Sequence, residues 1–140
     1  MKMLGTKRTI GRQVTYVGTH VIAELFDCKK LGDADQIERV LLDAAHRCGA
    51  TVLHSKFHRF EPQGLTGYIL LAESHISIHT WPEYGYAAVD AFTFGTMDPS
   101  YAVRLIAEGV AAQESNTRVV KRGGELPQSV LAAHPYGVVA

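Results

Sequence analysis

The sequence has little of several features that mark large protein classes. Cys28 and Cys48 are its only cysteines, and no Cys-x-x-Cys occurs. We therefore expect no disulfide framework, and we expect both thiols to be reduced. No apolar run approaches the roughly 20 residues of a membrane span, and the start lacks the apolar stretch of a signal peptide. Fourteen basic residues balance fourteen acidic ones, which predicts no general attraction to nucleic acid or membranes. We therefore expect a cytoplasmic protein without a nucleic-acid or membrane partner.

The composition is that of an ordinary globular protein. Hydrophobic residues make up 46% of the chain and charged residues 20%, and 140 residues suit one domain. We expect that domain to span 1–140, with a basic N-terminal extension over 1–14 and an irregular, Gly- and Pro-containing tail over 123–140.

Hydrophobic periodicity predicts an α+β fold. A helix is expected over 33–48, where Asp33 can cap the start and Gly49 suits the end, and a second helix starts at Asp98-Pro99. Each helix has one apolar stripe, so both can cover one face of a sheet. The combination predicts a two-layer sandwich with an antiparallel sheet and its helices on one face, and a second subunit would cover the other face. The expected strands are 16–28, 50–60, 66–73, 75–81, 84–94 and 117–121.

The segment 71–81 (LAESHISIHTW) concentrates polar side chains between apolar strands. Ile76 and Ile78 should face one way, and His75, Ser77 and His79 the other. A water-exposed polar strand face would explain this pattern, and so would a nucleophilic serine with a histidine base. The Gly-x-Ser-x-Gly elbow of serine hydrolases is absent.

A metal site is a further alternative that the histidines leave open. Two pairs, His54 with His58 and His75 with His79, are each four residues apart, so each pair shares one face of a strand. His-x-x-x-His on a strand is a weak signal, and no nearby cysteine or carboxylate completes a zinc site. We therefore predict no metal.

A longer pattern resembles a known family. The stretch 55–95, above all ESH at 73–75 followed by IHTWPEYGYAAVD at 78–90, resembles the core of the bacterial and archaeal S-adenosylmethionine decarboxylase proenzymes. GTH at 18–20 and AE at 23–24 resemble the family's first strand, and the likeness extends over roughly 18–112.

The resemblance implies a self-cleaving, pyruvoyl-dependent decarboxylase. In this family the Ser74 hydroxyl would attack the carbonyl carbon of Glu73, and elimination and hydrolysis would leave a pyruvoyl group at the new N-terminus. That covalent cofactor forms a Schiff base with an amino-acid-type substrate and accepts the electrons released with carbon dioxide. With S-adenosylmethionine as substrate, the product is the aminopropyl donor of spermidine synthesis. The resemblance also implies a homodimer of cleaved two-chain protomers, with sites near the subunit interface.

Four further residues take roles by resemblance. His79 matches the family histidine that assists processing, and Thr66 lies where the family has a serine that also aids it. Phe60 matches an aromatic residue that stacks on adenine, and Glu83 a carboxylate that binds the ribose hydroxyls. Core packing would also explain Phe60, and a solvated turn would also explain Glu83.

One position departs from the family pattern. The family cysteine that donates a proton to the substrate carbanion is replaced by Phe94, which has no proton to give. His79, Tyr86 or water could donate instead, or the chain could turn over S-adenosylmethionine slowly. The pocket could also suit ornithine or arginine, which relatives of the family decarboxylate. A non-catalytic regulatory homologue is the remaining alternative, and the retained Ser74 and His79 weigh against it.

Overall fold

The computed structural model describes residues 16–124, so the basic extension and nearly all of the predicted tail lie outside the described residues. Within this range the chain forms a sheet of six strands and two α-helices, as predicted. No helix in the described part of the chain is long and apolar enough to cross a membrane. The elements are β1 (Gly18–Phe26), α1 (Ala34–Arg47), β2 (Val52–Arg59), β3 (Leu65–Leu71), β4 (Ser74–Trp81), β5 (Tyr86–Thr93), α2 (Pro99–Gly109) and β6 (Glu114–Arg122).

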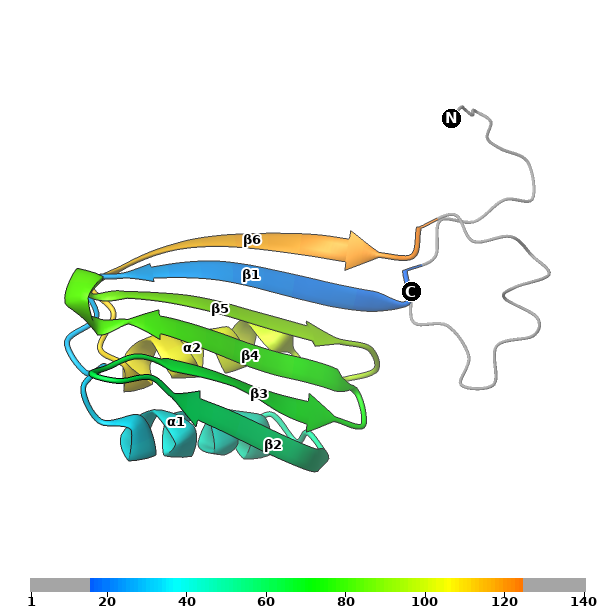
Figure 1. Ribbon diagram of the computed structural model, residues 1–140. Helices are drawn as coiled ribbons and strands as arrows, with labels where there is room; N and C mark the ends of the chain where they lie inside the picture. The colour runs from blue at the N-terminus through cyan, green and yellow to red at the C-terminus, as the bar shows by residue number, and fades with distance from the viewer. Residues whose placement is uncertain (1–15, 125–140) are drawn as a thin grey trace, which may run out of the picture.

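All neighbouring strands of the sheet are antiparallel, in the order β2-β3-β4-β5-β1-β6. Both helices pack against the same face of this sheet (Figure 1). The predicted two-layer α+β sandwich is therefore confirmed. The opposite face, which we call the open face, has no helix over it in the described part of the chain.

The helix boundaries follow from the capping residues. The Asp33 carboxylate accepts a hydrogen bond from the Gln36 N–H at the start of α1, and Asp98 accepts one from the Ser100 N–H at the start of α2. These bonds satisfy N–H groups that have no partner within the helix. The predicted caps are thus confirmed at both helices.

The core lies between the helices and one face of the sheet. Ile76 and Ile78 of β4 are fully buried there, while His75, Ser77 and His79 lie on the open face. The same alternation holds in β5, so the open face of the central strands is lined by partly exposed polar and aromatic side chains. At the neighbouring pair β2–β3, Gly67 leaves room for the ring of Phe57, because a Cβ at Gly67 would stand 2.1 Å from that ring.

One strand boundary differs from the prediction in a way that matters for the site. The strand expected over 66–73 ends at Leu71, because Ala72 and Glu73 form the turn that joins β3 to β4. Leu71 pairs with Ser74 across this turn. The Glu73–Ser74 peptide bond therefore lies at the tip of a tight hairpin and not within a strand.

Candidate active site

The hairpin between β3 and β4 holds Ser74 in an unusual backbone conformation. Its φ is 144°, in the region that side-chain-bearing residues rarely adopt. Ser74 is nonetheless paired on both sides, with Leu71 of β3 and with Thr93 of β5. Such strain persists only where the surrounding structure imposes it, and it is commonly found at functional positions.

The residue before Ser74 is fixed by two further hydrogen bonds. The backbone carbonyl oxygen of Glu73 accepts the N–H of Phe94, with an N···O distance of 3.1 Å. The Glu73 side chain accepts the N–H of Thr51, also at 3.1 Å. The first bond withdraws electrons from the carbonyl carbon of the Glu73–Ser74 peptide, and it would strengthen as negative charge developed on the oxygen.

Four of the residues singled out in the sequence gather at the other end of the sheet. Thr66 and His79 face each other across β3 and β4, with Oγ1 and Nδ1 3.1 Å apart. Both line a cavity of about 290 Å³, together with Phe60 and Glu83. Phe60 is about half exposed, so its ring is available as a stacking surface and is not part of the core.

The structure does not bring this cavity to Ser74 within one chain. Ser74 begins β4 and His79 lies five residues further along the same strand. At about 3.3 Å per residue, the two positions are roughly 16 Å apart. The Glu73–Ser74 turn and the Thr66–His79 pair therefore lie toward opposite ends of β4 on the open sheet.

The sequence model of the S-adenosylmethionine decarboxylase family matches residues 19–123 of this chain. The chain belongs to this family. An S-adenosylmethionine decarboxylase proenzyme from Geobacillus kaustophilus is 46% identical over 109 residues, which cover 76% of this chain and 88% of that protein. The proenzyme from Pseudomonas paraeruginosa is 44% identical over 130 residues, covering 91% and 77%.

A solved structure supports the same relationship. The crystal structure of the adenosylmethionine decarboxylase from Aquifex aeolicus matches with a TM-score of 0.72 and 36% identity. The match covers 81% of this chain and 96% of the other. The S-adenosylmethionine decarboxylase family consists of pyruvoyl-dependent decarboxylases made as proenzymes.

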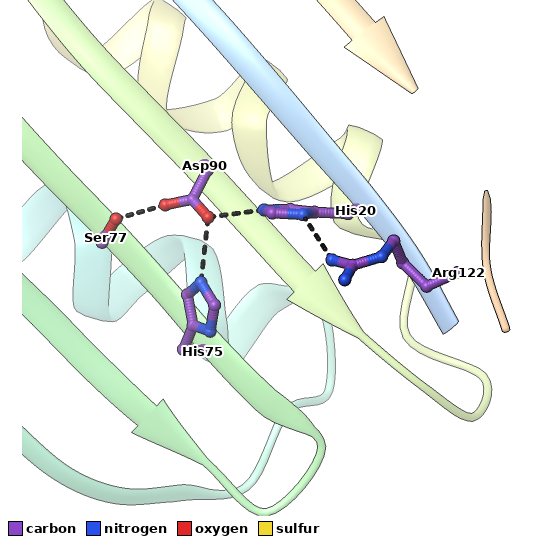
Figure 2. A network of polar contacts seen from close by, with 5 residues as sticks. All are labelled: His20, His75, Ser77, Asp90 and Arg122. Carbon is purple, nitrogen blue, oxygen red and sulfur yellow. Dashed lines mark hydrogen bonds and ion pairs between the residues drawn. The ribbon is translucent and has the colours of Figure 1, made fainter. Parts of the chain in front are cut away.

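Beside the β3–β4 turn, this S-adenosylmethionine decarboxylase family member carries a polar network on its open face (Figure 2). Asp90 of β5 is its centre: Oδ2 accepts from His20 Nε2 at 2.7 Å and from His75 Nε2 at 2.9 Å, and Oδ1 accepts from the Ser77 hydroxyl. Arg122 of β6 approaches His20 Nδ1 at 3.3 Å. The sequence analysis placed His75 and Ser77 on this face but did not identify the roles of His20, Asp90 and Arg122.

The network keeps Asp90 ionised. Burial by itself would raise the pKa of this carboxyl, but the hydrogen bonds from His75, Ser77 and His20 outweigh burial and hold the pKa far below its ordinary value of 3.8. The hydrogen bond to Asp90 in turn raises the pKa of His75 above 6.5, against the opposing effect of burial. A readily protonated imidazole, held by the Asp90 carboxylate, therefore lies one residue along β4 from Ser74.

The histidines are poorly arranged for a metal ion. The predicted pairs lie on β2 and β4, which are separated by β3 and so by about 9.6 Å, too far for a shared ligand set. His20, His75 and Asp90 do offer ligand atoms within 4.8 Å of one another. Arg122 is always a donor, however, so His20 Nδ1 must accept and the proton must stay on Nε2, where a metal would bind.

Proposed function

We propose that this chain is a self-cleaving, pyruvoyl-dependent decarboxylase that acts on S-adenosylmethionine, giving the aminopropyl donor for spermidine synthesis. The observation that supports self-cleavage most directly is the hydrogen bond from the Phe94 N–H to the Glu73 carbonyl oxygen, beside the strained Ser74. Both features suit the formation of a pyruvoyl group, because they activate the Glu73–Ser74 peptide bond, which must break.

The cleavage step follows from the chemistry of the hairpin. The Ser74 Oγ attacks the Glu73 carbonyl carbon, the C–N bond breaks, and an ester joins Glu73 to the Ser74 side chain. The Phe94 N–H stabilises the oxyanion that forms on the way. Breaking the peptide bond also releases the backbone strain at Ser74, typically about 1–3 kcal/mol.

The ester must then eliminate, and this step needs a base at Ser74. Removal of the proton on the Ser74 Cα expels the Glu73 carboxylate, and hydrolysis of the remaining enamine with loss of ammonia gives the pyruvoyl group. His79 is the base in our proposal, and Thr66 orients its ring through Nδ1. Within one chain His79 lies roughly 16 Å away along β4, so we infer that it acts from a second copy.

The open face supports this homodimer. It exposes large apolar side chains, including Tyr68, Leu70 and Trp81 at 39–44% exposure. The two helices cover the opposite face of the sheet (Figure 1). A second copy packed against the open face about a two-fold axis would cover these side chains. If the strands run oppositely in the two copies, the Ser74 end of each faces the His79 end of the other, which gives two complete sites.

The cavity beside His79 suits the substrate. The exposed Phe60 ring can stack on a flat base such as adenine, and the Glu83 carboxylate can accept hydrogen bonds from ribose hydroxyls. The pyruvoyl carbonyl at position 74 would bind the substrate amine and accept the electrons freed by loss of carbon dioxide. In this proposal, the chain that supplies His79 orients the nucleoside, and the other chain supplies the reacting carbonyl at position 74.

Phe94 supports a second candidate substrate class, ornithine or arginine. Phe94 is 38% exposed beside the Glu73–Ser74 turn, where its ring occupies more space than a thiol would. A smaller site favours an amino acid without a nucleoside. The non-catalytic alternative has no comparable support, because Ser74, its strained backbone and the Phe94 N–H on the Glu73 carbonyl are all retained.

The deciding experiment is the intact mass of the denatured protein. The wild-type chain should split at Glu73–Ser74, and Ser74→Ala should remain one chain of 15.3 kDa. Cyanoborohydride reduction with S-adenosylmethionine, ornithine or arginine, each offered separately, should add the true substrate to the fragment 74–140. A wild-type chain that stays whole and takes up no amine would contradict the proposal.

Mixing two variants tests the shared site. His79→Ala should cleave slowly or not at all alone, and Ser74→Ala cannot cleave. In a mixed dimer one site combines the intact Ser74 of the first chain with the intact His79 of the second. The His79→Ala chain should therefore cleave only after the two proteins are unfolded and refolded together, and its failure to do so would place His79 and Ser74 in the same chain.

A further inference from the structure

Decarboxylation leaves an electron pair on the substrate carbon that carried the carboxyl group, and this carbon must take up a proton before the product leaves. The side chain of Phe94 cannot supply it. We propose that His75, held by Asp90, is the general acid that protonates this carbon. This inference rests on the proposed function, since it concerns the turnover that follows cleavage.

His75 stands where such an acid is needed. It is bonded directly to Ser74, so the two Cα atoms are about 3.8 Å apart. Its side chain lies on the open face, in one row of the sheet with Phe92 and His20. The His75 and Phe92 ring centroids are 6.1 Å apart, and 38% of the His75 side chain is exposed. The imidazole therefore lies partly exposed on the open face, one residue along the chain from the residue that becomes the pyruvoyl group.

The hydrogen bonds of the ring leave one nitrogen available. Nε2 donates to Asp90 Oδ2 at 2.9 Å, while Nδ1 has no hydrogen-bond partner among residues 16–124. A carboxylate that holds one nitrogen of an imidazole fixes the ring and stabilises its protonated form, and the other nitrogen exchanges the proton. Consistent with this, the hydrogen bond to Asp90 raises the pKa of His75, although burial opposes it.

The charged and titratable groups around His75 favour it over its neighbours. Asp90 of β5 carries the negative charge, and Arg122 of β6 supplies the positive charge beyond His20. Arg122 donates to His20 Nδ1, so the single proton of His20 stays on Nε2 and is directed at Asp90. His20 therefore has no free nitrogen with which to protonate a substrate.

The other donors considered from the sequence are less suitable. The Tyr86 hydroxyl donates to Glu24, and this bond, with burial and the charge of Glu24, raises the pKa of Tyr86 to about 12. Tyr86 is also at the far end of β5, paired with Trp81. His79 would reach the site only from the second copy, and its Nδ1 is engaged with Thr66. His79 remains a competing donor that the experiment must separate.

The transfer itself is simple. Carbon dioxide leaves, the proton moves from His75 Nδ1 to the substrate carbon, and His75 regains a proton from water. A proton delivered instead to the carbon derived from Ser74 has a different outcome: the substrate nitrogen stays on the protein as an N-terminal alanine, and the substrate carbon is released as an aldehyde. The amount of N-terminal alanine therefore measures how often the proton reaches the wrong carbon, as expected when the general acid is missing.

The test compares His75→Gln with the wild type, using whichever of S-adenosylmethionine, ornithine and arginine the wild type decarboxylates. Glutamine can still donate to Asp90 but has no acidic proton. We expect His75→Gln to cleave at Glu73–Ser74 like the wild type, to lose at least tenfold in kcat, and to accumulate N-terminal alanine on the fragment 74–140. His54→Gln is the matched control, because His54 lies on the same face two strands away and should show neither effect.

A thiol at position 94 separates an acid from a structural residue. The double variant His75→Gln/Phe94→Cys should recover at least tenfold in kcat over His75→Gln and should stop forming alanine, because the thiol donates the proton. Three results would overturn the proposal: a kcat for His75→Gln within about threefold of the wild type, which would favour the second copy's His79; a lower kcat without alanine; or no rescue by the thiol. A wild type that neither cleaves nor turns over any of the three amines would instead refute the proposed function.

Discussion

Replacement of Asp90 by asparagine tests the open-face network through the stability of the protein. The amide can keep its oxygen toward His20 and His75 and turn its NH₂ toward Ser77, so the shape of the network is preserved while its charge is lost. The change should be made in a Ser74→Ala background, so that every chain remains in one piece. The measured quantity is the difference in the free energy of unfolding between the two proteins.

The size of the effect follows from the hydrogen bonds. Bonds to a charged group contribute about 1.5–3 kcal/mol and neutral ones about 0.5–1.5 kcal/mol, so each of the two imidazole bonds should weaken by about 1 kcal/mol. The folded pKa of Asp90 lies below 3.8, so its contribution is present above that pH and is lost as the pH falls. The folded pKa of His75 lies above 6.5, so its contribution is complete below 6.5 and is lost as the pH rises through that pKa.

Both contributions are complete between about pH 4 and pH 6.5, and there Asp90→Asn should cost about 2 kcal/mol. Near pH 9 the cost should fall to about 1 kcal/mol. Urea unfolding at one fixed protein concentration measures both values. Asp43→Asn is the control, because Asp43 pairs with Arg47 on an exposed helix surface and should change stability by less than about 0.5 kcal/mol. Equal costs of Asp90→Asn at both pH values would refute the charge argument.

Three further predictions follow from the same structure. Phe94→Ala should cleave at the wild-type rate, whereas Phe94→Pro, which lacks the N–H that binds the Glu73 carbonyl, should cleave at least a hundredfold more slowly in a time course by gel; equal rates would remove the oxyanion role of this amide. Phe94→Cys should raise the turnover of S-adenosylmethionine measured as released carbon dioxide, and a turnover unchanged by the thiol would indicate that pocket shape limits the reaction. Gly67→Ala should destabilise the protein by about 2 kcal/mol in urea unfolding, because its Cβ would overlap the Phe57 ring, and a loss below about 0.5 kcal/mol would show that the ring moves freely.

The parts of the fold that depend on local sequence were predictable. Asp33 and Asp98 mark helix starts because their side chains bond to N–H groups two or three residues further on. Ile76 and Ile78 reveal the buried face of β4 because alternation is a property of a single strand. β6 was only partly predicted, since all nine of its residues are exposed and no alternation of burial marks its ends.

The site was predictable only in part, because it depends on contacts between distant segments. The Asp90 network joins β1, β4, β5 and β6, and strand order and register decide which side chains meet. The distance between Ser74 and His79 could nevertheless be predicted from their separation along one strand. Five residues of strand already put the two positions roughly 16 Å apart. The resemblance supplied their roles but not this geometry.

The hydrogen bond from position 94 to Glu73 has a consequence for how such a protein can diverge. In the proposed cleavage, position 94 contributes only its main-chain N–H, and every residue except proline has one. In the proposed turnover, the side chain of the same residue would border the substrate. Under this proposal, substitutions at position 94 can change the substrate or abolish decarboxylation while self-cleavage still forms the cofactor. New substrate specificities could therefore evolve at this position without loss of self-cleavage.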